Sequence, residues 1–180
     1  PQNPKTPSSW NIMSKYILTY FKFTGWAEPI RMLLNHSGVE WEDNTLSIEE
    51  YKSSGIKDTF EFKQMPKLET PEGKSYYQSM CIMRYLGWKL GYYSDDIEEQ
   101  YMIDSMLDAV LDYRTSLMKA YYAPNEEEKK KLMREFFNTT TPHWMSIFEA
   151  WLKRVGTGFM ATNKITIADF VVWDLTCTWF

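Results

Sequence analysis

The residues best suited to bind a charged ligand lie in one stretch, Gln64 to Ser79. Pro71-Glu72-Gly73, between two short extended runs, is typical of a tight reversal, because proline fixes φ and glycine reaches positive φ. Pro66 has no N–H to donate and so suits the first position of a strand. Gln78 and Ser79 open a helical run whose first N–H groups can bind an anion. The stretch predicts a cradle for a small, peptide-like ligand that carries a carboxylate.

Composition argues against several other chemistries. Among 180 residues there are two cysteines, Cys81 and Cys177, far apart and outside any Cys-x-x-Cys unit. A disulfide scaffold or a dithiol centre is therefore not expected, and a reducing, cytoplasmic setting fits better. The two histidines, His36 and His143, argue against a His-rich metal site and a Ser-His-Asp hydrolase. With a net charge of −4, no basic stripe and no long apolar run, the sequence predicts neither nucleic-acid binding nor a membrane span.

The elements that must position the cradle occupy the N-terminal half. Residues 16–21 are rich in β-formers and almost continuously apolar, as a buried central strand should be. Helical crossovers come early and the hairpin comes late, which favours parallel pairing first and antiparallel pairing afterwards. The order β-α-β-α-β-β-α predicts a mixed four-stranded α/β sheet of thioredoxin type. Its remaining elements are expected at 28–37 (helix), 40–46 (strand), 48–56 (short irregular helix), the hairpin, and a helix to about Leu90.

The C-terminal half is predicted to be all-helical. Apolar residues recur at three- and four-residue spacing from Met102 to Tyr121, and the charged run 126–131 is typical of a solvated helix face. Pro142 is expected to begin a helix that ends at Gly156. Thr166 and Asp169 have the spacing of a capping box, in which each side chain binds the backbone N–H of the other. The expected domains are 14–91 and 97–180, with a disordered extension at 1–13 and a truncated C-terminal end.

Six motifs, in order and at matching spacing, resemble the cytosolic glutathione transferases, closest to the pi and sigma classes. The likeness covers Lys15 to Phe180. It implies a thioredoxin-like domain followed by an all-helical domain, a homodimer, glutathione as the co-substrate and no other cofactor. The motifs are Leu18-Thr19-Tyr20-Phe21, Ala27-Glu28-Pro29-Ile30-Arg31, Gln64-Met65-Pro66-Lys67-Leu68, Tyr77-Gln78-Ser79, Arg84-Tyr85-Leu86-Gly87 and Thr166-Ile167-Ala168-Asp169-Phe170.

The resemblance makes Tyr20 the catalytic residue. A phenol stays protonated at neutral pH and can donate a hydrogen bond to the glutathione sulfur, which stabilises the nucleophilic thiolate. From the strand pattern alone, Tyr20 would be a core residue with a locally satisfied hydroxyl.

The other implied contacts hold glutathione or line the second substrate's pocket. Met65 would pair its backbone with the cysteinyl unit, Pro66 would be a cis-proline, and Gln78 and Ser79 would bind the γ-glutamyl carboxylate. Asp112 would reach the glutathione of the partner subunit. The further glutathione contacts are Tyr20, Trp26, Tyr51, Lys57 and Gln64, and the wall of the apolar electrophile pocket is Phe21, Phe23 and Tyr122. No metal site is implied. Without the resemblance, these residues would be surface or core side chains.

One departure leaves alternatives open. Relatives have Gly-Arg-Ala where this chain has Gly25-Trp26-Ala27, and tryptophan offers one N–H and no charge. The resemblance implies a transferase that conjugates the glutathione thiolate to apolar electrophiles. The alternatives are a sigma-like prostaglandin isomerase and a non-catalytic binding or structural protein on the same scaffold.

Overall fold

The computed structural model describes residues 15–177, so the predicted extension at 1–13 lies outside the described residues. The chain forms two compact units that part between Tyr85 and Leu86, within one helix. We describe each unit by itself.

The first unit is built on a four-stranded mixed sheet in the order β2-β1-β3-β4, as predicted. β1 pairs in parallel with β2, with Tyr20 opposite Thr45, and antiparallel to β3, with Leu18 opposite Leu68. β3 and β4 form the predicted hairpin, in which Gly73 adopts φ +76° and its N–H donates to the Thr70 carbonyl over 2.8 Å. The strands are β1 (Tyr16–Phe21), β2 (Trp41–Leu46), β3 (Lys67–Glu69) and β4 (Ser75–Tyr77).

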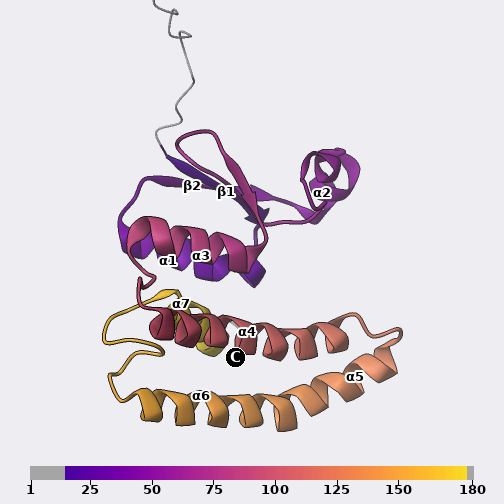
Figure 1. Cartoon of the computed structure of the whole chain (residues 1–180). Helices are drawn as coiled ribbons and strands as arrows, with labels where there is room; N and C mark the ends of the chain where they lie inside the picture. The colour runs from indigo at the N-terminus through magenta and orange to yellow at the C-terminus, as the bar shows by residue number, and fades with distance from the viewer. Residues whose placement is uncertain (1–14, 178–180) are drawn as a thin grey trace, which may run out of the picture. The chain divides into compact units, whose positions relative to one another are not determined.

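Helices α1 (Glu28–Ser37) and α3 (Ser79–Leu90) lie on the same side of this sheet, and α2 (Ile48–Ser53) lies apart from them (Figure 1). Proline in the first turn and Gly38 in the left-handed conformation bound α1, as its sequence predicts. The expected irregular helix at 48–56 is two pieces, α2 and the 3₁₀ turn η2 (Ile56–Thr59). The core beneath the sheet is apolar and fully buried, and includes Leu18, Ile30, Leu33, Leu34, Leu68 and Ile82.

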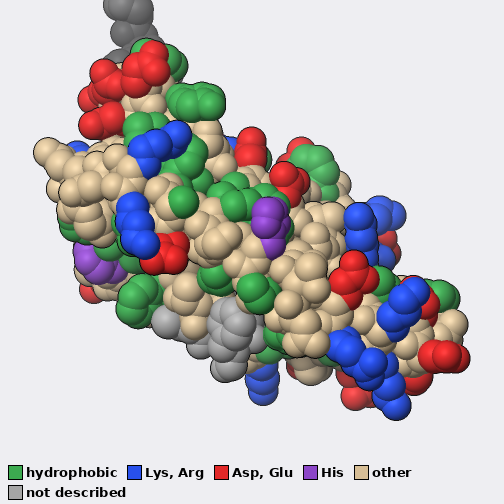
Figure 2. Space-filling view, turned by 90° about the horizontal axis from the view of Figure 1, so that it is seen from below, with side chains coloured by type: hydrophobic (Ala, Val, Ile, Leu, Met, Phe, Trp, Pro, Cys, Tyr) green, Lys and Arg blue, Asp and Glu red, His purple; other side chains and the backbone are tan. Residues whose placement is uncertain are grey.

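The second unit is all-helical, as predicted. Helix α4 (Ile97–Tyr121) begins at Asp96, whose carboxylate accepts the N–H groups of Glu98 and Glu99 over 2.9 and 3.0 Å. It packs against α5 (Glu126–Glu135) and α7 (Ile167–Cys177). Basic and acidic side chains are interspersed at the end where α5 lies, which fits the predicted solvated face (Figure 2).

One prediction about this unit is confirmed and one needs correction. The helix expected to begin at Pro142 and end at Gly156 is α6 (Thr141–Val155), which has proline in its first turn, and the π-helical turn η3 (Phe136–Thr140) joins it to α5 (Figure 1). The capping box at Thr166 is half formed. Asp169 accepts the Thr166 N–H over 2.7 Å, but the Thr166 hydroxyl donates to that same carboxylate over 3.1 Å. The second carboxylate oxygen accepts the N–H of Met160 over 2.8 Å, so Asp169 also fixes the loop before α7.

Among the helices of residues 15–177, none combines the length and the apolar character that a membrane crossing requires. Within the same residues, His, Cys, Asp and Glu side chains form no group of three or more that could ligate a metal ion.

Candidate functional site

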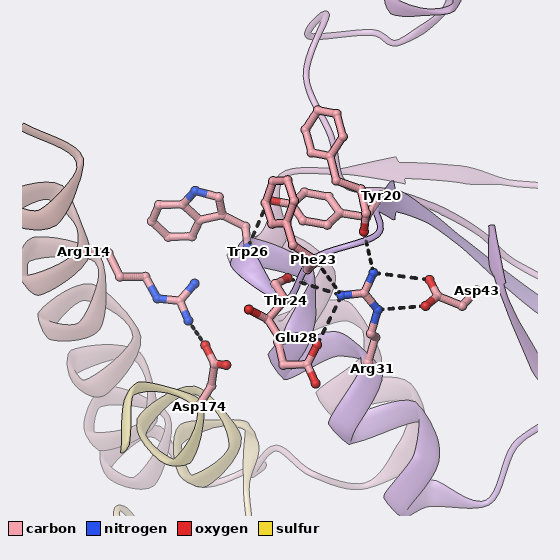
Figure 3. Close-up of polar contacts among 10 residues, drawn as sticks. Tyr20, Phe23, Thr24, Trp26, Glu28, Arg31, Asp43, Arg114 and Asp174 are labelled. Atoms are coloured by element: carbon pink, nitrogen blue, oxygen red, sulfur yellow. Dashed lines mark hydrogen bonds and ion pairs between the residues drawn. The ribbon is translucent and has the colours of Figure 1, made fainter. Parts of the chain in front are cut away.

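Tyr20 lies near the end of β1 with its side chain 4% exposed. Its hydroxyl oxygen accepts a hydrogen bond from the backbone N–H of Trp26 over 3.1 Å (Figure 3). A phenol can accept and donate at the same time, and an accepted hydrogen bond makes its own proton a better donor. Tyr20 is therefore equipped to donate to an anion such as a thiolate.

The loop that reaches the Tyr20 hydroxyl depends on Gly25. This residue has φ +51°, and a Cβ added to it would lie 2.7 Å from the Tyr20 hydroxyl oxygen. Only glycine combines that backbone conformation with so close an approach. The 3₁₀ turn η1 (Gly25–Ala27) then carries the Trp26 N–H to the hydroxyl.

Two aromatic rings predicted for the electrophile pocket lie beside Tyr20. Phe21 and Phe23 stack on each other at 5.2 Å between centroids, and both meet the Tyr20 ring edge-on, at 5.4 and 5.8 Å. Phe23 is 51% exposed, so it is not a core residue, which was the other interpretation of its position. An exposed ring stacked on a half-buried one, next to a polar hydroxyl, suits an apolar substrate.

The hairpin brings the predicted ligand-holding residues together. The Met65–Pro66 peptide bond is cis, as the resemblance implies, and Pro66 is buried. Gln64 precedes the hairpin and Gln78 follows it, yet the Gln78 side-chain amide donates to the Gln64 side-chain oxygen over 3.3 Å. Gln78 is exposed with φ +68°, immediately before Ser79 begins the 12-residue helix α3. A non-glycine residue at positive φ costs free energy and is more frequent at functional sites.

Tyr51 has a structural partner that the sequence did not indicate. Its hydroxyl donates to the Lys63 carbonyl over 2.8 Å, and Lys63 itself has φ +51°. The Tyr51 ring meets Phe21 edge-on at 5.3 Å, and burial raises the pKa of the phenol. Tyr51 thus supports the loop before Gln64, and its contact with glutathione stays a prediction. So does that of Lys57, which is exposed on η2.

Asp112 and Tyr122 belong to the second unit. Asp112 is exposed on α4, and Tyr122, directly after that helix, is 76% exposed. Their roles toward the partner's glutathione and the electrophile stay predictions.

Sequence reasoning assigned no role to Arg31 or Gly25. Arg31 appeared only as the last residue of the motif Ala27-Glu28-Pro29-Ile30-Arg31. The structure instead directs its guanidinium at the loop that follows Tyr20.

Comparison with known proteins gives the same family for both units. The family model of the glutathione S-transferase N-terminal domain matches residues 17–87, and that of the C-terminal domain matches residues 111–178. "Glutathione S-transferase 2" of Manduca sexta is 36% identical over 159 residues, which cover 88% of this chain and 76% of the relative. "Glutathione S-transferase P 1" of Xenopus laevis is 33% identical, covering 91% and 76%.

Two solved structures illustrate the range of similar proteins. Prostaglandin synthase D of Nilaparvata lugens superposes with a TM-score of 0.82 at 36% identity, covering 92% of this chain and 83% of that one. The monomeric glutathione S-transferase Na-GST-3 of Necator americanus gives a TM-score of 0.81 at 28% identity, covering 92% and 80%.

Proposed function

The chain belongs to the glutathione transferase family, and from this premise we propose that Tyr20 assists attack of the glutathione sulfur on an electrophile. The protein is a glutathione transferase with a thioredoxin-like N-terminal domain, an all-helical C-terminal domain and glutathione as co-substrate. What supports the proposal is the Tyr20 hydroxyl, which accepts the Trp26 N–H beside the stacked rings of Phe21 and Phe23, of which Phe23 is exposed.

In the proposed reaction, glutathione loses its thiol proton to solvent, and the Tyr20 hydroxyl donates a hydrogen bond to the resulting thiolate. The bond stabilises the anion, so more of the nucleophile is present near neutral pH. The sulfur lone pair then forms a bond to an electrophilic carbon, and the displaced electron pair leaves with the departing group. Phe21 and Phe23 would contact the apolar part of the electrophile, together with Tyr122.

Glutathione would be held along the hairpin. Met65 would offer its backbone to the cysteinyl unit, and the N-terminus of α3 at Ser79 would attract the γ-glutamyl carboxylate, because its first N–H groups point outward. Gln64 and Gln78, already joined by a hydrogen bond, would supply amide donors to that carboxylate. Trp26, Tyr51 and Lys57 complete the proposed set.

The homodimer and the cytoplasmic location are further parts of this proposal. Asp112 is exposed, so its carboxylate is available to a partner's ligand. The relative from Necator americanus is described as monomeric, so the oligomeric state has to be measured. We expect sedimentation at micromolar concentration to give a dimer, and a monomer there would contradict the role of Asp112.

The central experiment replaces Tyr20 by phenylalanine. Loss of a hydrogen bond to a charged group costs about 1.5–3 kcal/mol, so we expect conjugation to slow by about 10–150-fold while glutathione still binds. Tyr16→Phe is the matched control, because Tyr16 is a buried tyrosine on the same strand. Equal rates for Tyr20→Phe and the parent would remove the role proposed for the hydroxyl.

A second candidate function is glutathione-dependent isomerisation of a prostaglandin-type endoperoxide, favoured by the likeness to the prostaglandin synthase D. A substrate panel separates the two, because isomerisation returns glutathione unchanged and conjugation consumes it. Retention on glutathione resin without turnover of any substrate would favour the non-catalytic alternative instead.

A further inference from the structure

Arg31 is directed at the loop that links Tyr20 to Trp26. One terminal nitrogen of its guanidinium, Nη1, donates to the carbonyls of Phe23 and Thr24, each over 3.2 Å. The other, Nη2, donates to the carbonyl of Phe21 over 3.0 Å. A single side chain from α1 thus binds three carbonyls in the segment between Tyr20 and Gly25.

Two carboxylates fix the guanidinium from other directions. Asp43 on β2 accepts from Nε over 3.0 Å and from Nη2 over 3.4 Å, and Glu28 on α1 accepts from Nη1 over 3.2 Å. The Arg31 side chain is only 11% exposed. Because the planar guanidinium has five N–H donors in a fixed arrangement, it can serve carbonyls and carboxylates at once.

Charge alone does not explain this arrangement. The guanidinium carbon lies 5.8 Å from the centroid of the Tyr20 ring. However, the two negative charges of Asp43 and Glu28 exceed the single positive charge of Arg31. The field that the cluster exerts on the phenol is therefore largely offset. What the cluster does supply is geometry, because it attaches the loop to both α1 and β2.

We propose that Arg31 is a positioning residue for the reaction, holding the loop of residues 21–24 so that the Trp26 N–H stays on the Tyr20 hydroxyl. This inference rests on the function proposed for Tyr20. If the loop relaxes, the hydroxyl loses the donor that orients it, and its own hydrogen bond to the glutathione sulfur weakens.

The test compares Arg31→Lys with Asp43→Asn. A lysine has three donors on a flexible stem and cannot bind the three carbonyls and both carboxylates. The asparagine keeps an acceptor for Arg31 but removes the charge. The matched control is Glu42→Gln, because Glu42 is the exposed neighbour of Asp43 on β2 and pairs with Lys15 over 2.6 Å, away from the loop.

Two measurements distinguish positioning from mere stabilisation. The first concerns the thiol of glutathione. The thiol pKa of bound glutathione is measured by thiolate absorbance, and the pH profile of conjugation is recorded beside it. For Arg31→Lys we expect the profile to move to higher pH and kcat to fall about tenfold, the effect of weakening one hydrogen bond in the transition state. The second is hydrogen exchange of the Trp26 amide without ligand, which should accelerate while the β1 amides keep their protection. Asp43→Asn should shift the pH profile and the Trp26 exchange in the same direction as Arg31→Lys, but by less. Glu42→Gln should leave both measurements unchanged.

Unchanged thiol pKa and unchanged Trp26 exchange in Arg31→Lys would overturn the proposal, even if the melting temperature fell. If Arg31→Lys does not fold, Asp43→Asn takes its place in the test. Unchanged hydrogen exchange of the Trp26 amide in Asp43→Asn would then overturn the proposal. If the parent protein does not bind glutathione, the proposed function fails. The exchange measurement then still shows whether Arg31 holds the loop.

Discussion

Each unit contains an arginine bound to an aspartate, but the two sites differ in environment. In the first unit, Arg31 is 11% exposed and reaches two carboxylates and three loop carbonyls around Tyr20. In the second unit, Arg114 on α4 is 2% exposed and binds Asp174 on α7, which is fully buried. Figure 3 shows both arrangements.

Because the two sites differ in burial, we expect the pair in the second unit to contribute to stability and the cluster in the first unit to contribute to the reaction. A buried ion pair has a large desolvation cost, so the loss of one partner leaves the other charge buried without its counter-ion. A partly solvated cluster can be rearranged at lower cost, because water replaces the lost contacts. We therefore expect changes at Arg114 to affect folding, whereas changes around Arg31 and Tyr20 should affect the reaction first.

The largest expected effect comes from breaking the buried pair. Arg114→Met leaves Asp174 charged and buried, and should lower the free energy of unfolding by about 3–5 kcal/mol. Urea unfolding followed by circular dichroism measures it. The control is Arg134→Met, an exposed position in the last turn of α5. The double variant Arg114→Met/Asp174→Leu should recover most of the loss, because neither charge of the pair remains buried. A single variant as stable as the control would show that this pair does not differ from surface pairs.

The second-largest expected effect is that of Gly25→Ala, in the first unit, on conjugation. Alanine there must adopt φ +51°, which costs about 1–2 kcal/mol, and its Cβ would meet the Tyr20 hydroxyl. Gly73→Ala is the matched control, because Gly73 has φ +76° but nothing within 4 Å of an added Cβ. We expect Gly25→Ala to lose more stability in urea than Gly73→Ala, because its Cβ also meets the Tyr20 hydroxyl, and we expect only Gly25→Ala to lose conjugation. If both keep full activity, the close packing of the loop on Tyr20 is not required for the reaction.

Local signals in the sequence predicted most of the fold. Helix α1 has proline at its start, Gly38 at its end and a buried face of Ile30, Leu33 and Leu34, all encoded within ten residues. The hairpin was equally local. What the sequence did not predict is the junction before this helix, where the π-helical turn η3 joins α5 to α6. Leu111 shared the apolar spacing of α4 but is 41% exposed, since spacing alone does not reveal which faces find partners.

The site was less predictable than the fold. The cis state of Pro66 and the role of Tyr20, which stays a prediction, came from the resemblance and not from any local pattern. The roles of Arg31 and Gly25 depend on contacts between elements: Arg31 meets Asp43 across 12 residues, and Gly25 is constrained by a hydroxyl on β1. The hydroxyl of Tyr51, similarly, bonds to Lys63 twelve residues away. Such contacts follow from the packed structure, and no propensity or spacing in a single sequence encodes them.

The smallest expected effect is on the pH dependence of stability at alkaline pH, where one tyrosine of each unit can be compared. Burial, with smaller contributions from Tyr76, Tyr16 and Glu72, raises the pKa of Tyr85 in the first unit from 10.0 to about 12. Its ring stacks on Tyr76 at 4.2 Å. Because the folded state resists ionisation of the phenol, its contribution to stability is complete below the unfolded pKa and is lost as pH rises from 10 toward 12.

Tyr113 in the second unit gives the counterpart. Burial raises its pKa as well, but its hydrogen bond with Thr141 and the neighbouring Arg114 cation act in the opposite direction. In urea unfolding across this alkaline range, the free energy of unfolding should therefore fall less steeply with pH for Tyr85→Phe than for the parent. Tyr113→Phe should also differ from the parent in this slope, but by less than Tyr85→Phe does. Since the cation that opposes the shift is the one paired with Asp174, Arg114→Met should steepen the dependence at Tyr113 and leave that of Tyr85 unchanged. An equal effect on both tyrosines would mean that the buried pair acts through overall stability and not through its local charge.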